Sequence, residues 1–307
     1  MNDKTQELIR QARKLARRHR ITDGKGFNLS DHDPKDTGPF EKSDQDFATQ
    51  ALADGKVALS EMQERLYAQD RWSLLLVFQA MDAAGKDGAI KHVMSGVNPQ
   101  GCEVTSFGVP SSKDLDHTWL WRCMVALPER GRIGIFNRSY YEETLVARVH
   151  PGVIAGQHLP PQLVTDDIWD ERFDDIRHFE KHLSRNGTVV RKIFLHLSKG
   201  EQRERLLARL DEPKKNWKFR MNDVEERSHW KDYQHAYERT IRHTASEDSP
   251  WFVVPADHKW YSRIVVASII VDALDSLDLH FPEVDDSQKS VLEEARSRLT
   301  KTPKEVS

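Results

Sequence analysis

The segment that most constrains the fold is an apolar run that leads directly into a loop of small residues and a lysine. Residues 73–78 read SLLLVF, and a run without polar alternation predicts a strand buried on both faces, as in a parallel sheet. Residues 80–87 follow as AMDAAGKD, ahead of a stretch with helical periodicity. This order places backbone N–H groups where they can surround a phosphate. The segment therefore predicts an α/β fold with a phosphate-binding loop.

The loop keeps part of the pattern G-x-x-x-x-G-K-[ST] and departs from it at both ends. Gly85 and Lys86 are present, whereas Ala80 replaces the first glycine and Asp87 replaces the terminal hydroxyl residue. Lys86 is predicted to be catalytic, because its ammonium can stay close to the phosphoryl group during transfer and neutralise its charge. The loop residues predicted to bind phosphate are Ala83, Ala84, Gly85, Lys86 and Asp87.

Asp82 is the candidate metal ligand, because the hydroxyl that usually holds Mg²⁺ in such loops is missing. A carboxylate supplies the hard oxygen that Mg²⁺ prefers, and it would repel a phosphate unless a cation lay between them. We therefore predict that Asp82 is catalytic and binds the metal. The alternative is an aspartate that only closes a turn through its own backbone.

A second strand end carries polar side chains within GRIGIFNRSYYEE, residues 131–143. Asn137 and Arg138 follow the apolar part, and ligands of open α/β sheets gather at the carboxyl ends of strands. Arg138 can bind phosphate oxygens with its forked guanidinium, so both residues are predicted to be catalytic. Ser139 and Glu142 also match the S-x-x-E capping box, and a structural role for this pair is equally compatible.

A basic segment around residues 214–220 is predicted to form part of a lid. It holds four basic and no acidic side chains, and aromatic residues lie between them. Such a segment can close over a polyphosphate and neutralise charge, although charge runs often form only a solvated helical hairpin. The predicted phosphate-binding residues here and on the preceding helix are Arg205, Arg209, Lys215 and Lys218.

The remaining pattern predicts a three-layer αβα sandwich with a parallel central sheet, because short strands alternate with helices. The further predicted strands are 103–107, 133–136, 189–195 and 251–254, and the helices are 114–126, 139–149, 167–183, 200–210 and 258–277. We expect an N-terminal helix and arm (1–45), a core (46–281) with the lid at about 211–245, and a charged tail (282–307) with a loose helix over 290–299.

Composition excludes several classes of protein. The chain has 46 Lys+Arg against 49 Asp+Glu, a net charge of −3, which argues against a protein that coats nucleic acid. Cys102 and Cys123 form no disulfide framework and lack the spacing of a zinc site. The uncharged apolar stretch 264–271 is too short to span a bilayer, and no signal peptide is evident. We therefore expect a cytoplasmic protein without membrane partners.

Four segments together resemble the polyphosphate kinase type 2 family, the polyphosphate:nucleotide phosphotransferases. The resemblance covers roughly residues 35–275. Its segments are DHDPKDTGPF (31–40), FQAMDAAGKDGAIKHV (78–93), FNRSYYEETLVARVHP (136–151) and RLDEPKKNWKFRMNDVEER (209–227).

The resemblance implies a P-loop kinase core with a helical lid, Mg²⁺ (Mn²⁺ as a substitute), inorganic polyphosphate as donor and a nucleotide as acceptor. Asp82 and Lys86 would belong to the Walker A site, and Asn137 and Arg138 to the Walker B site, where many members have Asp in place of Asn137. Asn137 together with Glu142 is similar to the subgroup that acts on mono- and diphosphates, which makes Glu142 the candidate for nucleotide specificity. Homo-oligomers, dimers or tetramers, are also implied.

The predicted reaction is a reversible, Mg²⁺-dependent transfer of a phosphoryl group from polyphosphate to AMP or ADP, which forms ADP or ATP. Adenine nucleotides are the expected acceptors, with guanine nucleotides as a second option. Two alternatives remain at this point: an ATP-dependent nucleoside monophosphate kinase, and a non-catalytic regulator that binds nucleotide or polyphosphate.

Overall fold

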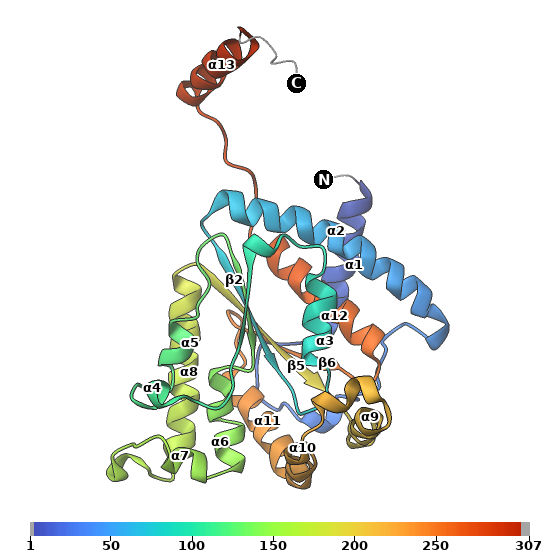
Figure 1. The fold of residues 1–307 in the computed structure, drawn as a ribbon, viewed down its shortest axis with the longest axis vertical. Coiled ribbons are helices and arrows are strands. Elements are labelled where there is room, and N and C mark those ends of the chain that lie inside the picture. Colours follow the sequence, from blue (N-terminus) through green and yellow to red (C-terminus); the bar gives the residue numbers. More distant parts are fainter. Residues whose placement is uncertain (1–2, 302–307) are drawn as a thin grey trace.

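The computed structural model describes residues 3–301, so the predicted positions 1–2 and 302–307 lie outside the described residues. Within this range the chain forms one six-stranded sheet in the order β1-β6-β5-β2-β4-β3 (Figure 1). The strands are β1 (Arg20–Ile21), β2 (Ser73–Gln79), β3 (Cys102–Ser106), β4 (Ile133–Asn137), β5 (Thr188–His196) and β6 (Trp251–Pro255). All pairings are parallel except that of β1 with β6.

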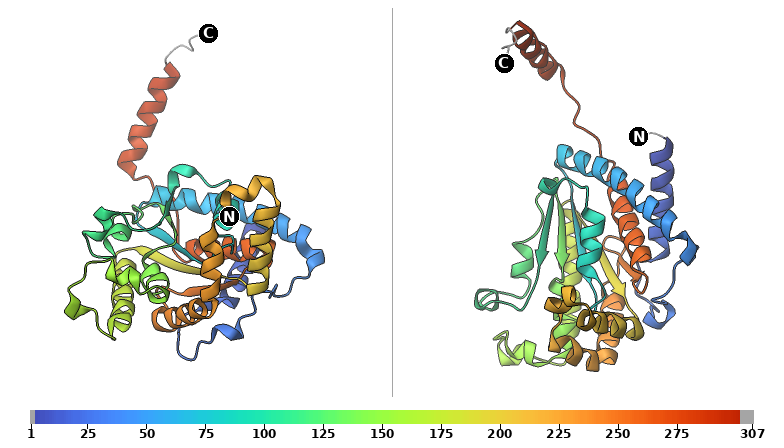
Figure 2. Two further views of the ribbon diagram at one scale, coloured as in Figure 1. Left: turned by 60° about the horizontal axis from the view of Figure 1, so that its bottom comes forward. Right: turned by 45° about the vertical axis from the view of Figure 1, so that its right-hand side comes forward.

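Helices cover both faces of the sheet, as predicted for a three-layer sandwich. β2 is buried along its whole length, and its alternate residues enter two different cores. Leu74 and Leu76 face helices α1 (Asp3–Arg18), α2 (Gln45–Gln69), α3 (Lys86–Met94) and α12 (Lys259–Asp275). Leu75 and Val77 face α8 (Ile168–Arg185) and α11 (Trp230–Thr244). Figure 2 shows the two helical layers edge-on.

A buried ion pair fixes the second face. The Lys192 ammonium donates to Glu180 Oε2 at 2.6 Å and to the Thr244 carbonyl at 2.6 Å. The other carboxylate oxygen of Glu180 accepts from the hydroxyls of Tyr140 and Tyr141 at 2.9 and 2.7 Å. A buried charge needs such complete pairing. The cluster therefore joins β5, α8 and α11 to the segment that follows β4.

Two predicted helices are wrong in extent. The range 114–126 holds two short helices, α4 (Ser112–Leu115) and α5 (Trp121–Met124), and Trp119 in the break packs against the Arg172 guanidinium at 4.6 Å. The range 139–149 divides into a 3-10 turn (Tyr140–Glu143) and α6 (Val146–Val149). Ser139 is an extended N-cap whose hydroxyl accepts the Tyr141 N–H, and Leu145, with φ of −110° and ψ of −82°, leaves the helical conformation, so the helix does not continue from one piece to the other.

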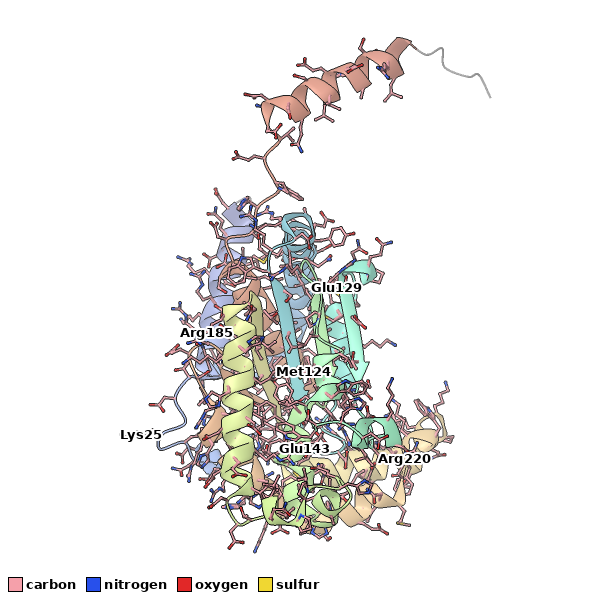
Figure 3. The ribbon with its side chains drawn as sticks, turned by 90° about the vertical axis from the view of Figure 1, so that its left-hand side faces the viewer. Lys25, Met124, Glu129, Glu143, Arg185 and Arg220 are labelled. Carbon is pink, nitrogen blue, oxygen red and sulfur yellow. The ribbon has the colours of Figure 1, made fainter. Side chains whose placement is uncertain are left out.

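The N-terminal segment packs against the core, whereas the C-terminal helix does not. α1 packs along α12, and β1, a strand absent from the prediction, pairs with β6. The predicted boundaries near 45 and 281 fall at the start of α2 and after α12. Helix α13 (Asp286–Lys301) is longer than predicted and stands away from the rest of the molecule (Figure 3). The remaining helices are α7 (Gly152–Ala155), α9 (Lys199–Asp211) and α10 (Met221–Glu226). In residues 3–301, no helix has the length and apolar character needed to cross a membrane.

Candidate active site

The loop between β2 and α3 has the backbone of a phosphate cradle. Ala83 and Gly85 both have left-handed conformations, with φ of 63° and 100°, and α3 begins directly afterwards at Lys86. A φ of 100° is free of strain only for glycine, which explains Gly85 at the turn into the helix. The Lys86 ammonium folds back over the loop and donates to the Ala80 carbonyl at 2.6 Å. The predicted strand, loop and helix are therefore confirmed.

The end of β4 lies beside this loop because β4 pairs in parallel with β2, with Asn137 opposite Phe78. The Asn137 amide donates to Asp87 Oδ1 at 2.8 Å. Arg138 has a φ of 65°, and its N–H donates to the Phe78 carbonyl at 3.0 Å. This conformation directs Arg138 from the end of β4 toward the phosphate loop.

Arg138 lies between two carboxylates. One guanidinium nitrogen is 3.4 Å from Asp82 Oδ1, and the other is 3.7 Å from Glu142 Oε2. Burial opposes the charge of Arg138, but Glu142 and Asp82 outweigh burial and raise its pKa. Burial raises the pKa of Glu142, while Arg138 acts in the opposite direction. The structure thus places all the predicted catalytic residues and Glu142 in one cluster.

The charge of Lys86 has little compensation in this cluster. Burial and the nearby Arg138 guanidinium lower its pKa, although the neighbouring carboxylates act in the opposite direction. An anion placed between two cations would favour the charged form of both. The arrangement of Lys86 and Arg138 is therefore suited to a phosphoryl group.

The residues predicted to belong to the lid and to the helix before it lie on α9, a 3-10 segment (Pro213–Lys218) and α10. Arg209 donates to Asp223 Oδ2, which joins α9 to α10. Lys215 pairs with Glu212 at the surface, and the Lys218 ammonium lies 5.1 Å from the Trp217 ring centre. Each of these contacts is exposed or half-buried, so the basic side chains can be drawn to an anion at small cost.

A cleft of about 410 Å³ joins the loop, the end of β4 and the lid. Its lining is residues 81–89, Asn137, Arg138, Arg205, Ala208, Arg209, Lys215, Lys218, Lys259, Ser262 and Arg263. Eight of these side chains are basic and two are acidic. The net charge of −3 for the whole chain therefore conceals a strongly cationic cleft.

Arg205 has a structural role that the sequence interpretation did not include. Its guanidinium donates to the carbonyls of Ala83, Ala84, Ala256 and Asp257 at 2.6–3.2 Å, and Nε donates to Glu201 at 2.8 Å. All five N–H donors of the side chain are occupied. The side chain therefore holds the loop to the segment that follows β6, and its predicted contact with phosphate stays a prediction.

Three residues of the cleft were missed from the sequence: Lys259, Ser262 and Arg263, on the first turns of α12. Neither Lys259 nor Arg263 makes an ion pair within residues 3–301. Burial lowers the pKa of Lys259, and Arg205 and Lys215 lower it further. The sequence could have indicated these residues, because α12 follows the carboxyl end of β6. Ligands of open α/β sheets gather at the carboxyl ends of parallel strands.

Two carboxylates on the phosphate loop supply the kind of oxygen donors that Mg²⁺ prefers. In the described part of the chain, no three His, Cys, Asp or Glu side chains surround a common point that could hold a metal. Asp82 and Asp87 nevertheless present carboxylates on the phosphate loop. Mg²⁺ is usually held by one or two carboxylates, water and substrate phosphates, so these residues fit it.

Comparisons with known proteins agree with this geometry. The sequence matches the family model described as Polyphosphate kinase 2 over residues 42–282. An ADP-polyphosphate phosphotransferase of Rhodopseudomonas palustris is 48% identical over 283 residues, which cover 92% of this chain and 97% of that protein. An AMP/ADP-polyphosphate phosphotransferase of Meiothermus ruber is 44% identical over 278 residues, which cover 90% of this chain and 100% of that protein.

A solved structure shows the same fold. The crystal structure of polyphosphate kinase 2 from Arthrobacter aurescens superposes with a TM-score of 0.82 at 36% sequence identity. The match covers 91% of this chain and 96% of that one. The resemblance of the four sequence segments is thus confirmed over most of the chain, and the chain belongs to the polyphosphate kinase 2 family.

Proposed function

We propose that this chain transfers a phosphoryl group from inorganic polyphosphate to AMP or ADP, in a reversible reaction that requires Mg²⁺. The observation that carries the proposal is the lining of the cleft beyond the phosphate loop. ATP as donor would need an apolar or aromatic surface for its base and ribose. Here that region holds Lys215, Lys218, Lys259 and Arg263. A row of cations suits a chain of phosphates better than a nucleoside.

The names of the relatives support both substrates. The two proteins with 48% and 44% identity are named as polyphosphate phosphotransferases of ADP and of AMP/ADP. Their similarity spans nearly the whole of each protein, so the donor and acceptor parts of the cleft are both included.

The reaction needs alignment and charge neutralisation more than proton transfer. A terminal phosphate oxygen of AMP or ADP attacks the terminal phosphorus of polyphosphate, and the bridging P–O bond of the donor breaks. The bridging oxygen keeps the electron pair on a chain one phosphate shorter. Because the attacking oxygen is already ionised, no strong base is required. Lys86 and Arg138 flank the site of transfer and offset the charge on the equatorial oxygens.

Mg²⁺, or Mn²⁺ in its place, would neutralise charge on the phosphates and hold them in line. Asp82 is the proposed ligand, since it lies on the loop 3.4 Å from Arg138 and would otherwise repel a phosphate. Asp87 is held by the Asn137 amide, which keeps a second carboxylate at the mouth of the loop. Asn137 thus acts on the orientation of Asp87.

Glu142 is the proposed determinant of acceptor length. Its carboxylate is only 16% exposed and lies 3.7 Å from a nitrogen of Arg138. A change at Glu142 would therefore move the guanidinium that faces the acceptor phosphate. Adenine nucleotides are the proposed acceptors, with guanine nucleotides as a second option.

The test supplies polyphosphate and Mg²⁺ with AMP or ADP, without ATP, and separates the products by anion-exchange chromatography. The proposal predicts ADP and ATP as products. Parallel reactions replace polyphosphate with ATP. Products with ATP alone would identify a nucleoside monophosphate kinase, and binding without products from either donor would identify a regulator; each result would overturn the proposal.

A further inference from the structure

The phosphate loop is supported by the inner face of α9. Gln202 and Arg205 lie three residues apart on this helix, so they share a face, and they are 1% and 8% exposed. The Gln202 amide donates to the Asp82 carbonyl at 3.1 Å, and Arg205 donates to the next two carbonyls of the loop. The helix therefore binds three consecutive loop carbonyls, those of Asp82, Ala83 and Ala84.

Ala83 needs this support because its backbone is left-handed, with φ of 63°. A residue with a Cβ is strained there and keeps the conformation only where surrounding contacts fix it. Gln202 holds the carbonyl before Ala83, and Arg205 holds the carbonyl of Ala83 itself. Since the carbonyl and the N–H of a trans peptide point in opposite directions, the bond from Gln202 also turns the Ala83 N–H away from α9. Without this bond, the peptide between Asp82 and Ala83 is free to turn over.

The lid fixes the orientation of the Gln202 amide. An amide has a donor end and an acceptor end, so a buried amide satisfies both only in one orientation. Gln202 Oε1 accepts from Arg227 Nη1 at 2.9 Å, which leaves Nε2 to face Asp82. Arg227 directly follows α10 of the predicted lid, and the same nitrogen donates to the Lys199 carbonyl at 2.8 Å. Two hydrogen bonds therefore connect the lid to the Asp82 main chain.

We propose that Gln202 is a positioning residue for phosphoryl transfer and that Arg227 acts through it. Gln202 keeps the Asp82 carboxylate on the Arg138 side of the loop, 3.4 Å from the guanidinium, and keeps the Ala83 N–H available to a phosphate. Neither Gln202 nor Arg227 is among the residues that line the cleft, so both act on the substrate only through the loop. This inference rests on the proposed function, in which Asp82 is the metal ligand and the loop binds phosphate.

The first test compares Gln202→Met with the wild type. Methionine has a similar volume and cannot donate to the Asp82 carbonyl. We expect turnover with polyphosphate and AMP to fall at least about tenfold. Binding of tripolyphosphate with Mg²⁺, measured by isothermal titration calorimetry without an acceptor, should also weaken about tenfold. Unchanged tripolyphosphate binding by the folded variant would overturn the proposal, whatever its turnover.

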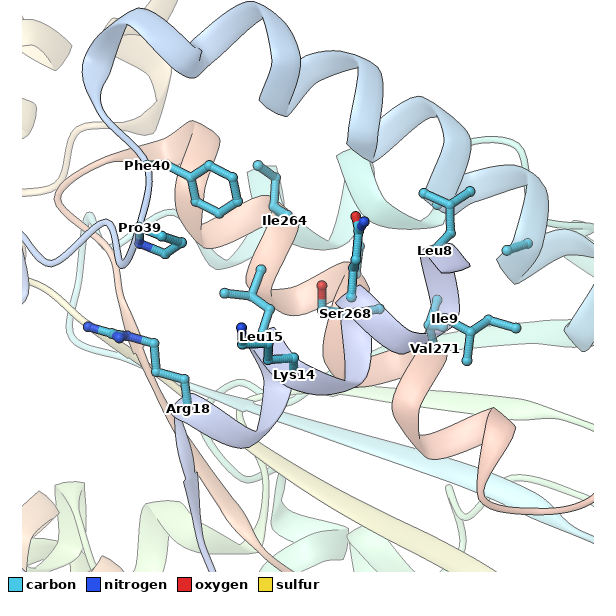
Figure 4. Close-up of a pocket in the computed structure, with 15 residues that line it drawn as sticks. Leu8, Ile9, Lys14, Leu15, Arg18, Pro39, Phe40, Ile264, Ser268 and Val271 are labelled. Atoms are coloured by element: carbon cyan, nitrogen blue, oxygen red, sulfur yellow. The ribbon is translucent and has the colours of Figure 1, made fainter. Parts of the chain in front are cut away.

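Val271→Ala is the control for a loss of stability alone. Val271 is buried and lines an apolar cavity of about 510 Å³ between α1, α2 and α12, which shares no lining residue with the cleft (Figure 4). Its truncation is expected to lower the unfolding midpoint, while turnover and tripolyphosphate binding stay at the wild-type level. If Val271→Ala lost tripolyphosphate binding as Gln202→Met does, the loss would reflect stability and would refute the positioning role.

The second test is a double-mutant cycle with Arg227→Met. Arg227 is only half-buried, so this variant is expected to fold even if Gln202→Met does not. Arg227→Met should weaken tripolyphosphate binding, and the double variant should bind as Gln202→Met does, because Arg227 acts through Gln202. Wild-type binding by Arg227→Met, or losses that multiply in the double variant, would contradict the coupling. These binding measurements decide the role of Gln202 even if the wild type transfers no phosphoryl group, a result that would refute the proposed function alone.

Discussion

The substitution Arg205→Ala removes the side chain that holds the phosphate loop from beneath. Arg205 is 8% exposed, and four of its five hydrogen bonds go to main-chain carbonyls. Two of the carbonyls belong to the loop, and two follow β6. The variant therefore disconnects the loop from the start of α12, in addition to removing a charge.

The size of the effect follows from these bonds. Each hydrogen bond contributes about 1 kcal/mol net, so the loss of five amounts to about 4–5 kcal/mol before water enters the space. For a chain of this size, that loss corresponds to a fall in the unfolding midpoint on the order of 10 °C. Arg205→Lys should lose roughly half as much, since an ammonium has three donors and no fork.

The assay combines thermal unfolding with steady-state kinetics for polyphosphate and AMP. Arg203→Ala is the control, because Arg203 lies on the same helix with 66% of its side chain exposed. Its unfolding free energy should change by less than about 0.5 kcal/mol. If Arg205→Ala unfolds at the same temperature as this control and only the KM for polyphosphate rises, Arg205 binds substrate and the structural assignment is wrong.

Three further predictions concern the cleft and the pH dependence of stability. Lys86→Met should lower turnover by about a thousandfold or more, because a transition-state charge contact is lost; an equal rate with an equal unfolding midpoint would contradict this role. Combining Lys259→Ala with Arg263→Ala should raise the KM for polyphosphate about tenfold, the cost of about 1.4 kcal/mol, and leave the KM for AMP unchanged; an equal rise for both substrates would exclude a donor-side role. Burial lowers the pKa of His19 from 6.5 to about 4, and the neutral ring bonds to Tyr261. Its stabilisation is complete above pH 6.5 and is lost as pH falls toward 4, by up to about 3 kcal/mol. In His19→Gln, the urea midpoint of unfolding should depend less on pH between 6.5 and 4. The same pH dependence as in the wild type would show that His19 does not titrate in this range.

The sequence was most informative where strand and loop chemistry coincide. The run at 73–78 predicted a central parallel strand, and parallel pairing alone places Asn137 and Arg138 beside the loop. The turn after β4 was less predictable. Its conformation depends on the buried Glu180, which is distant in sequence and accepts both tyrosine hydroxyls.

Arg205 and Arg209 show a different limit. They are four residues apart on α9, so they share a helix face, and the sequence gives no means to separate their roles. The packing of α9 places Arg205 beneath the loop and Arg209 against Asp223 of the lid. Lys259 and Arg263 were missed because they precede a long apolar run and resemble ordinary solvated charges.

Transfer of ³²P from labelled polyphosphate to AMP tests directly whether polyphosphate is the phosphoryl donor and whether Lys86 acts in the transfer. The protein is incubated with labelled polyphosphate, AMP and Mg²⁺ in the absence of ATP, and Lys86→Met is followed in parallel. We expect label in the β-phosphate of ADP at a rate about a thousandfold higher for the wild type than for Lys86→Met. Label that appears only in inorganic phosphate, or equal transfer by both proteins, would contradict it.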